Sequence, residues 1–391
     1  MSGRAIATAL AVTTLVGLVV FVERHHLFDP ARPASTSSAH VTGTPAEVLA
    51  QRDESPARVV SQDERLAALR KARVWKAPKQ PIATASLAPE AALGIVECRF
   101  REVDLHGTTP KFNCVADTGG DFRVKYGMGS EIPAEAAATK LLTILGFGAD
   151  IVTLVERLRC FGCPPDPFLT TKVADATHTK PLLDRVVDKD DFREYEWVAT
   201  ERKFPARPIE TKDEEGWAFF ELDTIDPASG APLAHVDALR LLAVFLAHWD
   251  NKAANQRLVC LTKDWPEGTP CRDPFLMLQD VGATFGPKKA NLDGWRAAAV
   301  WEDRASCTVS MRDHPYGGST FKSRRISEGG RRFLADLLTQ LTDRQMAELF
   351  AGARFDERRN ILKDSRPVSD WVRVFKAKVE AIATAGPCPQ E

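Results

Sequence analysis

The chain has 391 residues, and its 52 basic and 53 acidic residues give a formal net charge of −1 at pH 7. This balance offers no electrostatic reason to bind nucleic acid, so we expect no nucleic-acid partner. Beyond an N-terminal region of different composition, about 300 residues remain, which is enough for two ordinary domains or for one unit of two lobes.

The N-terminal segment is apolar, and residues 5–22 carry no charged side chain. Its length lies at the lower end for a helix that spans a bilayer, and it exceeds most signal-peptide cores. No clear small-x-small cleavage site follows, so residues 1–26 are expected to form an uncleaved membrane anchor, with a cleaved signal peptide as the alternative. The flanking charges do not decide on which side of the membrane the rest of the chain lies.

Residues 27–92 are rich in Pro, Ala, Ser, Thr and Arg and poor in residues that build a core, which predicts a flexible linker. Within it, Ser61 and Glu64 have the spacing of a capping box. A short helix is expected there, either packed on the folded domain or transient.

Eight cysteines follow, mostly as local couples. The couples are Cys98 with Cys114, Cys160 with Cys163, and Cys260 with Cys271, and Cys307 and Cys388 are left over. An even count beside an export signal favours disulfides, although the sequence does not fix their connectivity. The folded domain is therefore expected to face an oxidising, extracytoplasmic space, either the periplasm or a secretory lumen. The Cys-x-x-Cys couple could instead be a redox or zinc pair, but no second pair of that spacing supplies the other zinc ligands.

From residue 94 to residue 126, short β-prone runs alternate with turn residues, which predicts a small antiparallel sheet. Gly107 lies in the first turn, and Lys125 lies on the third run. Residues 133–146 begin with Pro and end with Gly, which predicts a helix. Glu135 lies in its first turn and Glu131 just before it.

Farther along, residues 151–158 and 217–222 are predicted to be strands, and residues 161–191 form an insertion without clear periodicity. An apolar segment, residues 236–247, is typical of a buried helix. After residue 290 three helices are expected, at 331–341, 343–351 and 368–383, with Thr342 as a cap for the second. A basic cluster around residues 322–332 is either a contact for an acidic substrate, a phosphate or anionic lipid, or a solvated face.

The chemistry is concentrated directly after the apolar segment, in His248-Trp-Asp250-Asn-Lys252-Ala-Ala-Asn255, and in Asp280-Val-Gly282 farther on. Phosphoryl transfer needs an acidic group that accepts the proton of a hydroxyl and oxygen ligands that hold magnesium on the phosphates. Asp250 can be the first, and Asn255 and Asp280 can be the second.

An Asp and an Asn at this spacing should occur about once by chance in a chain of this length. Requiring the His and the Lys as well lowers that chance to roughly one in a thousand chains. The alternative is a helix end that runs into a polar loop, in which Asp250 and Asn255 bond to local backbone.

The loop resembles the H-x-D-x-K-x-x-N catalytic loop of the protein-kinase-like superfamily, with Trp249 where Arg is usual. The Gly-Thr-Thr-Pro-Lys-Phe turn at Gly107, the strand lysine and the Glu-x₆-Leu-x-x-Leu-Gly helix are similar to HipA-type kinases. The segment from Asp280 to Gly286, Asp-Val-Gly-Ala-Thr-Phe-Gly, is similar to phosphoinositide kinases and to secretory-pathway atypical kinases. The resemblance is carried by separate segments that together extend over roughly residues 95–290.

The resemblance implies an α+β, bilobal fold, with a small antiparallel-sheet N-lobe carrying one helix over residues 93–222 and a mainly helical C-lobe over residues 223–391. It implies ATP bound with Mg²⁺ or Mn²⁺ between the lobes. The resemblance implies that Asp250 is the catalytic base, that Lys252 contacts the transferred phosphoryl group, and that Asn255 and Asp280 are the metal ligands. It implies that Lys125 and Glu135 clamp the phosphates, with Glu131 as the second candidate for the glutamate, and that Gly107 belongs to the turn that covers the phosphates. Glu221 and Leu222 would lie where the lobes join, beside the adenine.

A protein hydroxyl is the expected acceptor, with lipid and small-molecule hydroxyls as alternatives. Two other hypotheses remain: a non-catalytic pseudokinase that serves as a scaffold, and a transferase that moves another group, such as AMP. Glu221 and Leu222 have an alternative as well, since residues 217–222 could be an ordinary core strand. Nothing after Asp280 resembles the Ala-Pro-Glu end of an activation segment, so regulation by a typical activation loop is not expected.

Overall fold

A computed structural model describes residues 56–105, 107–116, 120–127, 129–179, 187–314, 319–357 and 366–389. The predicted anchor, residues 1–26, and the first part of the predicted linker, residues 27–55, lie outside the described residues. Among the helices that the structure describes, none has the length and apolar content needed to cross a membrane.

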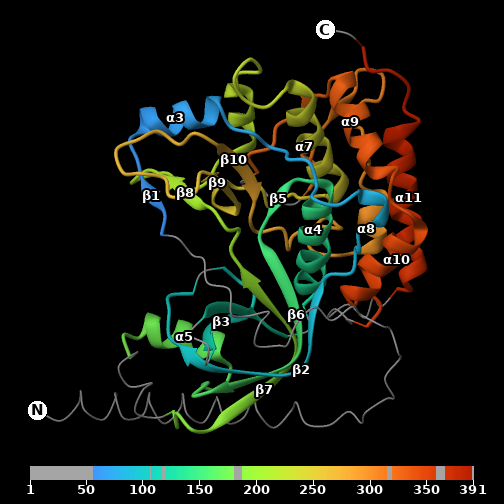
Figure 1. The fold of residues 1–391 in the computed structure, drawn as a ribbon. Helices are drawn as coiled ribbons and strands as arrows, with labels where there is room; N and C mark the ends of the chain where they lie inside the picture. Colours follow the sequence, from blue (N-terminus) through green and yellow to red (C-terminus); the bar gives the residue numbers. More distant parts are fainter. Residues whose placement is uncertain are drawn as a thin grey trace, which may run out of the picture.

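The chain folds into two lobes, a small barrel at the bottom of Figure 1 and a larger, helix-rich lobe above it. The barrel strands, in order of pairing, are β2 (Glu90–Arg101), β3 (Lys111–Ala116), β4 (Asp121–Lys125), β7 (Phe192–Arg202) and β6 (Ile151–Phe161). β2 also pairs with β6, in parallel, and this pairing closes the sheet. The small sheet expected from the sequence is therefore present, but as a closed barrel with one parallel pair.

Two disulfides lie in the core of the barrel. Cys98 is bonded to Cys114, and Cys160 to Cys163. All four cysteines belong to the same buried cluster, which is separate from the core of the larger lobe. The disulfides thus supplement a barrel that has few buried apolar side chains of its own.

The larger lobe is built on a five-stranded sheet and on a group of helices. The strands, in order of pairing, are β1 (Arg58–Val59), β8 (Arg207–Glu210), β9 (Gln256–Cys260), β10 (Pro274–Leu278) and β5 (Gly148–Ala149). The helices are α7 (Leu233–Leu246), α8 (Leu292–Ala297), α9 (Glu328–Leu338), α10 (Asp343–Gly352) and α11 (Val368–Ala383), beside the short pair β11 (Thr308–Val309) and β12 (Arg324–Arg325). The helices predicted after residue 290 and the Thr342 cap are confirmed.

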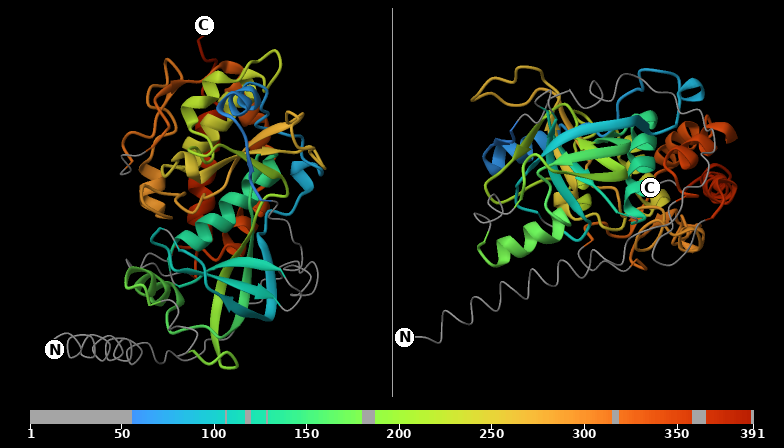
Figure 2. Two further views of the ribbon diagram at one scale, coloured as in Figure 1. Left: turned by 90° about the vertical axis from the view of Figure 1, so that its left-hand side faces the viewer. Right: turned by 90° about the horizontal axis from the view of Figure 1, so that it is seen from below.

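The helix α4 (Glu131–Leu145) connects the two lobes. It ends at Gly146, whose φ of 90° is unfavourable for other residues, and a Cβ there would lie 2.3 Å from the carbonyl oxygen of Lys76. The buried apolar side chains of α4 belong to the main core, which also takes in Val152 and Leu154 of β6 and Ala199 of β7, and not to the core inside the barrel. Figure 2 shows α4 between the barrel and the helices of the larger lobe. The helix therefore packs both on the larger lobe and on the ends of two barrel strands.

The prediction of a flexible linker is wrong for residues 56–92, because these residues contain β1, α3, η1 and the start of β2. Residues 56–89, which we call the belt, run over the larger lobe before the chain enters β2. The belt contains α3 (Gln62–Arg70), which starts with the expected capping box, and η1 (Ile82–Thr84). The side-chain amide of Gln345 donates to the carbonyl oxygens of Ile82 and Ala85, both at 2.7 Å. The belt is rich in Pro, Ala, Lys and Arg, which suggested disorder from the sequence alone, but its Leu69, Val74, Ile82 and Leu87 are buried in the core.

Three further expectations need correction. Residues 217–222 do not form a strand, because the chain there forms a 3-10 helix, η2 (Phe219–Thr224). The insertion contains α5 (Pro167–Ala176), which begins with Pro after Asp166, whose side chain accepts a hydrogen bond from the N–H of Leu169 at 3.2 Å. The chain leaves the barrel at the end of β7 and not at residue 222, and residues 207–222 belong to the larger lobe.

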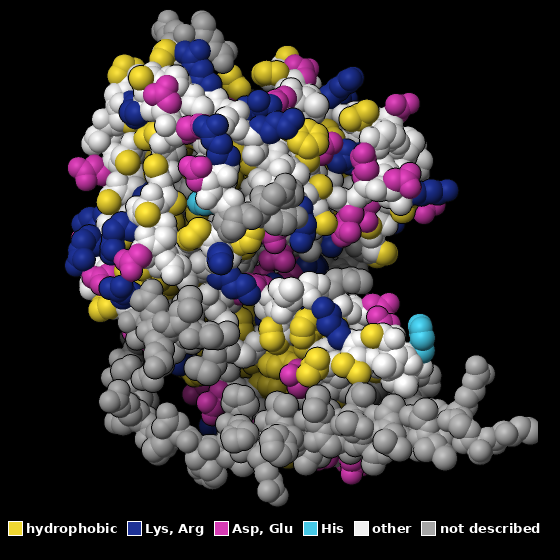
Figure 3. All heavy atoms as spheres, turned by 180° about the vertical axis from the view of Figure 1, so that it is seen from behind, with side chains coloured by type: hydrophobic (Ala, Val, Ile, Leu, Met, Phe, Trp, Pro, Cys, Tyr) yellow, Lys and Arg dark blue, Asp and Glu magenta, His cyan; other side chains and the backbone are white. Residues whose placement is uncertain are grey.

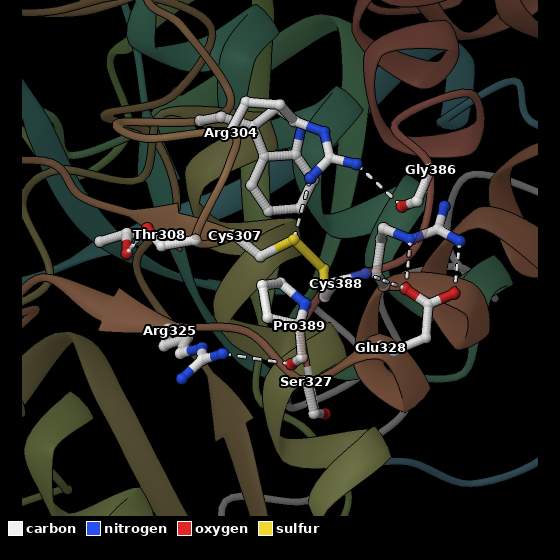
Figure 4. The surroundings of a disulfide bond; sticks show 12 residues. Arg304, Cys307, Thr308, Arg325, Ser327, Glu328, Gly386, Cys388 and Pro389 are labelled. Carbon is white, nitrogen blue, oxygen red and sulfur yellow. Dashed lines mark hydrogen bonds and ion pairs between the residues drawn. A yellow bond between two sulfur atoms is a disulfide. The ribbon is translucent and has the colours of Figure 1, made fainter. Parts of the chain in front are cut away.

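The C-terminus is bonded to the larger lobe by the disulfide Cys307–Cys388, shown in Figure 4. Arg304 donates to the carbonyl oxygen of Gly386 at 2.8 Å, and the N–H of Cys388 donates to Glu328 at 2.8 Å. We call this group the C-terminal clamp. The remaining disulfide, Cys260–Cys271, closes the hairpin between β9 and β10.

Candidate active site

Lys125, the last residue of β4, lies where the barrel meets α4. Its ammonium nitrogen is 2.6 Å from Glu135 Oε1, 3.5 Å from Glu201 and 3.9 Å from Asp280. Burial of the ammonium would lower the pKa of Lys125, but the surrounding carboxylates, Asp280 foremost, outweigh it and raise that pKa well above its usual value. Lys125 is thus a fixed cation, and the structure brings it together with the first-choice glutamate, Glu135.

The predicted catalytic loop starts where α7 ends, at Ala247, whose φ is 55°. The side-chain amide of Asn255 donates to the carbonyl oxygen of Asp250 at 2.6 Å. The carbonyl oxygen of Asn255 in turn accepts from the N–H groups of Gln279 at 2.9 Å and Asp280 at 3.1 Å. These hydrogen bonds, all to main-chain carbonyl oxygens, hold Asp250, Asn255 and Asp280 at one place between the lobes. Figure 3 shows acidic and basic side chains gathered where the molecule narrows between its lobes.

The two carboxylates of this site differ in their electrostatic surroundings. The charge of Lys125 lowers the pKa of Asp280, which favours an ionised ligand for a cation. Burial raises the pKa of Asp250, and one of its oxygens, Oδ1, is buried without a hydrogen-bond partner among the described residues. Lys252 lies 3.9 Å from the other oxygen. A basic carboxylate beside an ionised one suits a proton acceptor next to a metal ligand.

The turn at Gly107 is held from two sides. Lys172 of α5 donates to the carbonyl oxygen of Gly107 at 2.6 Å, and the Thr109 hydroxyl donates to Glu131. Glu131 also pairs with Lys289 at 2.8 Å, and a Cβ on Gly282 would lie 2.4 Å from the Glu131 side chain. Glu131, the second candidate partner of Lys125, therefore joins the cover turn to the segment after Asp280.

Glu221 and Leu222 do not lie where the lobes join. Glu221 pairs with Arg65 of the belt at 2.8 Å, and Leu222 is buried in the core of the larger lobe. Residues 203–206 make the connection instead, because β7 of the barrel leads directly through them into β8. β7 was not predicted from the sequence, because its first half alternates exposed and half-buried residues and its apolar signal is therefore weak.

A cavity of about 260 Å³ lies beside this connection. Lys203, Phe204 and Ala206 line it from the connection, and Arg257 and Met277 line it from β9 and β10. It adjoins the site, because Arg257 donates to Gln279, the residue before Asp280. The cavity has a position and lining that could take a nucleotide base.

Three further polar residues around the site, Glu201, Lys203 and Asp150, were not predicted from the sequence. Glu201 lies between Lys125 and Lys203, and Lys203 also pairs with Asp150 at 3.0 Å. Burial raises the pKa of Asp150 to about 6. These contacts join β4, the end of β7 and the residue after β5, so no local motif reveals them.

Asn251, within the catalytic loop, is completely buried. Its side-chain oxygen accepts from the N–H groups of Thr320 at 2.8 Å and Phe321 at 3.0 Å, and its amide nitrogen donates to the carbonyl oxygen of His248 at 2.9 Å. Burial lowers the pKa of His248 to about 4, so that the imidazole is neutral at physiological pH. The side chain of Asn251 and the main chain of His248 thus hold the start of the loop from its buried side.

The residues present suit a hard divalent cation. Mg²⁺ and Mn²⁺ prefer carboxylate and carbonyl oxygens and keep positions for phosphate and water. Asp280 and Asn255 supply such oxygens from adjoining segments, since the N–H of Asp280 donates to the carbonyl oxygen of Asn255 at 3.1 Å. The fit rests on the chemistry of these donors and on the buried, unpartnered oxygen of Asp250 beside them.

No family model matches this chain, and no curated protein matches it. Among solved structures, the proinflammatory kinase CtkA of Helicobacter pylori is similar with a TM-score of 0.38 and 10% identity, over 74% of this chain and 97% of that one. The Golgi casein kinase, in a crystal structure with Mn/ADP bound, is similar with a TM-score of 0.33 and 10% identity, over 83% of this chain and 74% of that one. These scores are low, and the description of the fold as bilobal and protein-kinase-like rests on the arrangement of β4, α4 and the loop after α7.

Proposed function

We propose that the protein is an ATP-dependent phosphotransferase that moves the γ-phosphoryl group to a hydroxyl, most readily that of a protein. The observation that carries this proposal is the meeting of the Lys125–Glu135 ion pair with Asp250, Asn255 and Asp280 between the lobes. A polar cluster that only stabilised the fold would not require a buried lysine held by three carboxylates next to Asp250, an acid of raised pKa. Lipid and small-molecule hydroxyls remain the alternative acceptors.

In this proposal each side chain has a defined task. Lys125, positioned by Glu135, binds phosphate oxygens, and Asn255 and Asp280 would hold Mg²⁺ or Mn²⁺, which would neutralise charge on the phosphates. Asp250 takes the proton of the acceptor hydroxyl. The acceptor oxygen bonds to the γ-phosphorus while the bond from that phosphorus to ADP breaks, and Lys252 stabilises the charge of the group in transfer. The cavity beside residues 203–206 would hold the base, in place of Glu221 and Leu222.

The four disulfides support an oxidising location for both lobes, which agrees with an extracytoplasmic domain behind a membrane anchor. The anchor itself and the side of the membrane remain part of the proposal. ATP would then have to be present in that space, as in a secretory lumen.

Turnover of ATP by the full chain, with Mg²⁺ or Mn²⁺, tests this function. We expect Asp250→Asn and Asp280→Asn each to lower turnover by about 10²-fold or more with the fold intact. Asp213→Asn, at an exposed position away from the site, is the control. A product heavier by a nucleoside monophosphate would replace phosphorylation by nucleotidyl transfer, and absence of nucleotide binding with every metal would leave a scaffold.

A further inference from the structure

We propose that the four cysteines of the barrel, Cys98, Cys114, Cys160 and Cys163, bind one Zn²⁺ ion when their two disulfides are reduced. We call these four residues the sulfur cluster. The cluster lies in the core of the barrel and shares no residue with the candidate active site, so the inference stands apart from the proposed function.

The strands of the barrel bring the four sulfurs together. Cys98 of β2 and Cys160 of β6 are direct partners in the parallel pair of these strands. Cys114 of β3 is bonded to Cys98, and Cys163, just after the end of β6, is bonded to Cys160. Cys-x-x-Cys is a spacing with which one segment gives two ligands to a zinc ion. The sequence offers one pair of this spacing, and the fold supplies the other two ligands from β2 and β3.

The distances between sulfurs of different disulfides suit a tetrahedral site. The Sγ atoms of Cys114 and Cys160 are 3.8 Å apart without being bonded to each other, and those of Cys98, Cys114 and Cys160 all lie within 4.8 Å of one another. With Zn–S bonds of about 2.3 Å, the sulfurs of a tetrahedral site are about 3.8 Å apart. Reduction breaks the two S–S bonds, after which rotation of the cysteine side chains can bring all four sulfurs to that spacing.

The chemistry of the sulfur cluster favours zinc over the cations of the active site. All four side chains are buried, and no carboxylate or imidazole of the described residues joins this group of ligands. Four thiolates are a ligand set of structural zinc sites, whereas Mg²⁺ and Mn²⁺ prefer oxygen. Four thiolates around Zn²⁺ leave an excess of negative charge. Arg193, which donates to the carbonyl oxygen of Cys163 at 3.2 Å, places a cation beside it.

The proposed change is a reduction followed by metal binding. Each disulfide takes two electrons and two protons from a dithiol reductant, which itself becomes a disulfide, and two thiols are left. The four thiols then release their protons as Zn²⁺ binds the sulfurs. Oxidation reverses both steps and expels the ion. The same four sulfurs therefore cross-link the barrel in either redox state, by two disulfides in an oxidising space or by one zinc ion in a reducing one.

Native mass spectrometry of the full chain with Zn²⁺, before and after treatment with dithiothreitol, tests the inference. We expect one zinc ion per reduced chain and none in the oxidised chain, and Co²⁺ in place of zinc should give the visible absorption of cobalt in a tetrahedral thiolate site. The paired change Cys98→Ser with Cys114→Ser removes two ligands and should weaken zinc binding by at least about 10²-fold. The paired change Cys260→Ser with Cys271→Ser should leave zinc binding unchanged. It is the matched control, because it also removes one disulfide, outside the sulfur cluster.

Alkylation of the unmodified chain tests the same site should the first variant not fold. In the reduced protein, zinc should protect the cysteines of the sulfur cluster from iodoacetamide, as mapped by peptide mass spectrometry, and a chelator should abolish the protection. Cys307 and Cys388, outside the cluster, should react to the same extent with and without zinc. The inference is overturned by a reduced chain that binds no zinc, by unchanged zinc affinity in the variant with Cys98→Ser and Cys114→Ser, or by alkylation of the cluster that zinc does not alter.

Discussion

At the scale of single residues, Asn251 supports the catalytic loop. Its side-chain oxygen accepts from the buried backbone of residues 320 and 321. Asn251→Ala would leave these N–H groups without an acceptor, so we expect the free energy of unfolding to fall by about 2–4 kcal/mol in denaturant titration. Ser319→Ala removes only one hydroxyl donor to the same oxygen and should cost less than about 1 kcal/mol. Equal effects of the two changes would contradict this role.

The raised pKa of Asp250 predicts a pH dependence. A base must be ionised, so kcat should fall as the pH drops through the pKa of Asp250, at a higher pH than for an ordinary aspartate. The charge of Lys252 lowers the same pKa. Lys252→Met should therefore move the acid limb of the kcat profile to higher pH, besides lowering kcat. An acid limb at the same pH in both proteins would show that another group is titrating.

The residues that could be predicted are those with local spacing. Asp250 and Asn255 lie on one loop, and Lys125 and Glu135 lie on a strand and the helix that follows it. Glu201 could not be predicted, since it meets Lys125 only because β7 pairs with β4 across the barrel. The contacts of Asn251 likewise depend on a segment about 70 residues farther along the chain.

At the scale of elements, the C-terminal clamp stabilises α9 and α11 together. The disulfide Cys307–Cys388 spans 81 residues, for which chain entropy gives about 4.5 kcal/mol. Cys260–Cys271 spans 11 residues and gives about 3 kcal/mol on the same basis. Paired Cys→Ala changes should therefore destabilise the protein more at the clamp than at the hairpin, as measured by chemical denaturation. The opposite order would contradict a clamp that acts by restricting the unfolded chain.

Glu328 makes the clamp sensitive to acid. Hydrogen bonds from Arg331 first, and from the N–H of Cys388, lower the pKa of Glu328 to about 2. A lowered folded-state pKa stabilises the protein above the unfolded value of 4.5, and this stability is lost as the pH falls toward 2. Glu328→Gln should remove this part of the acid dependence, on the order of 1 kcal/mol after allowance for solvent screening. Parallel stability curves for the two proteins between pH 5 and about 2 would contradict it.

Elements with strong periodicity were predictable, and elements held by distant contacts were not. α7, α10 and α11 follow from apolar spacing. β7 carries mostly polar residues and the belt is rich in Pro, Ala, Lys and Arg, and both owe their structure to pairing and packing with segments far along the chain. Residues 217–222 have strand-forming side chains but turn into η2, where Glu221 accepts from the N–H of Ala218 at 2.7 Å and binds the belt.

At the scale of the whole molecule, the lobes are joined at several places. The belt enters the barrel at β2, residues 126–130 lead from β4 to α4, residues 146–150 lead out of α4 into β6, and residues 203–206 lead back. β5, within the third of these, also pairs with β10 of the larger lobe. A rotation of the barrel must bend all of these connections at once, so we expect the two lobes to open only slightly.

The burial of α4 has a consequence for control of the proposed enzyme. In protein kinases, activity is commonly switched by moving the glutamate helix toward or away from the strand lysine. Here that helix is part of the main core, and its last turn is closed by Gly146 against the belt. Swinging it outward would expose Leu141, Leu142 and Leu145, at a cost of several kcal/mol. We therefore expect that the proposed enzyme is not controlled by an outward swing of α4.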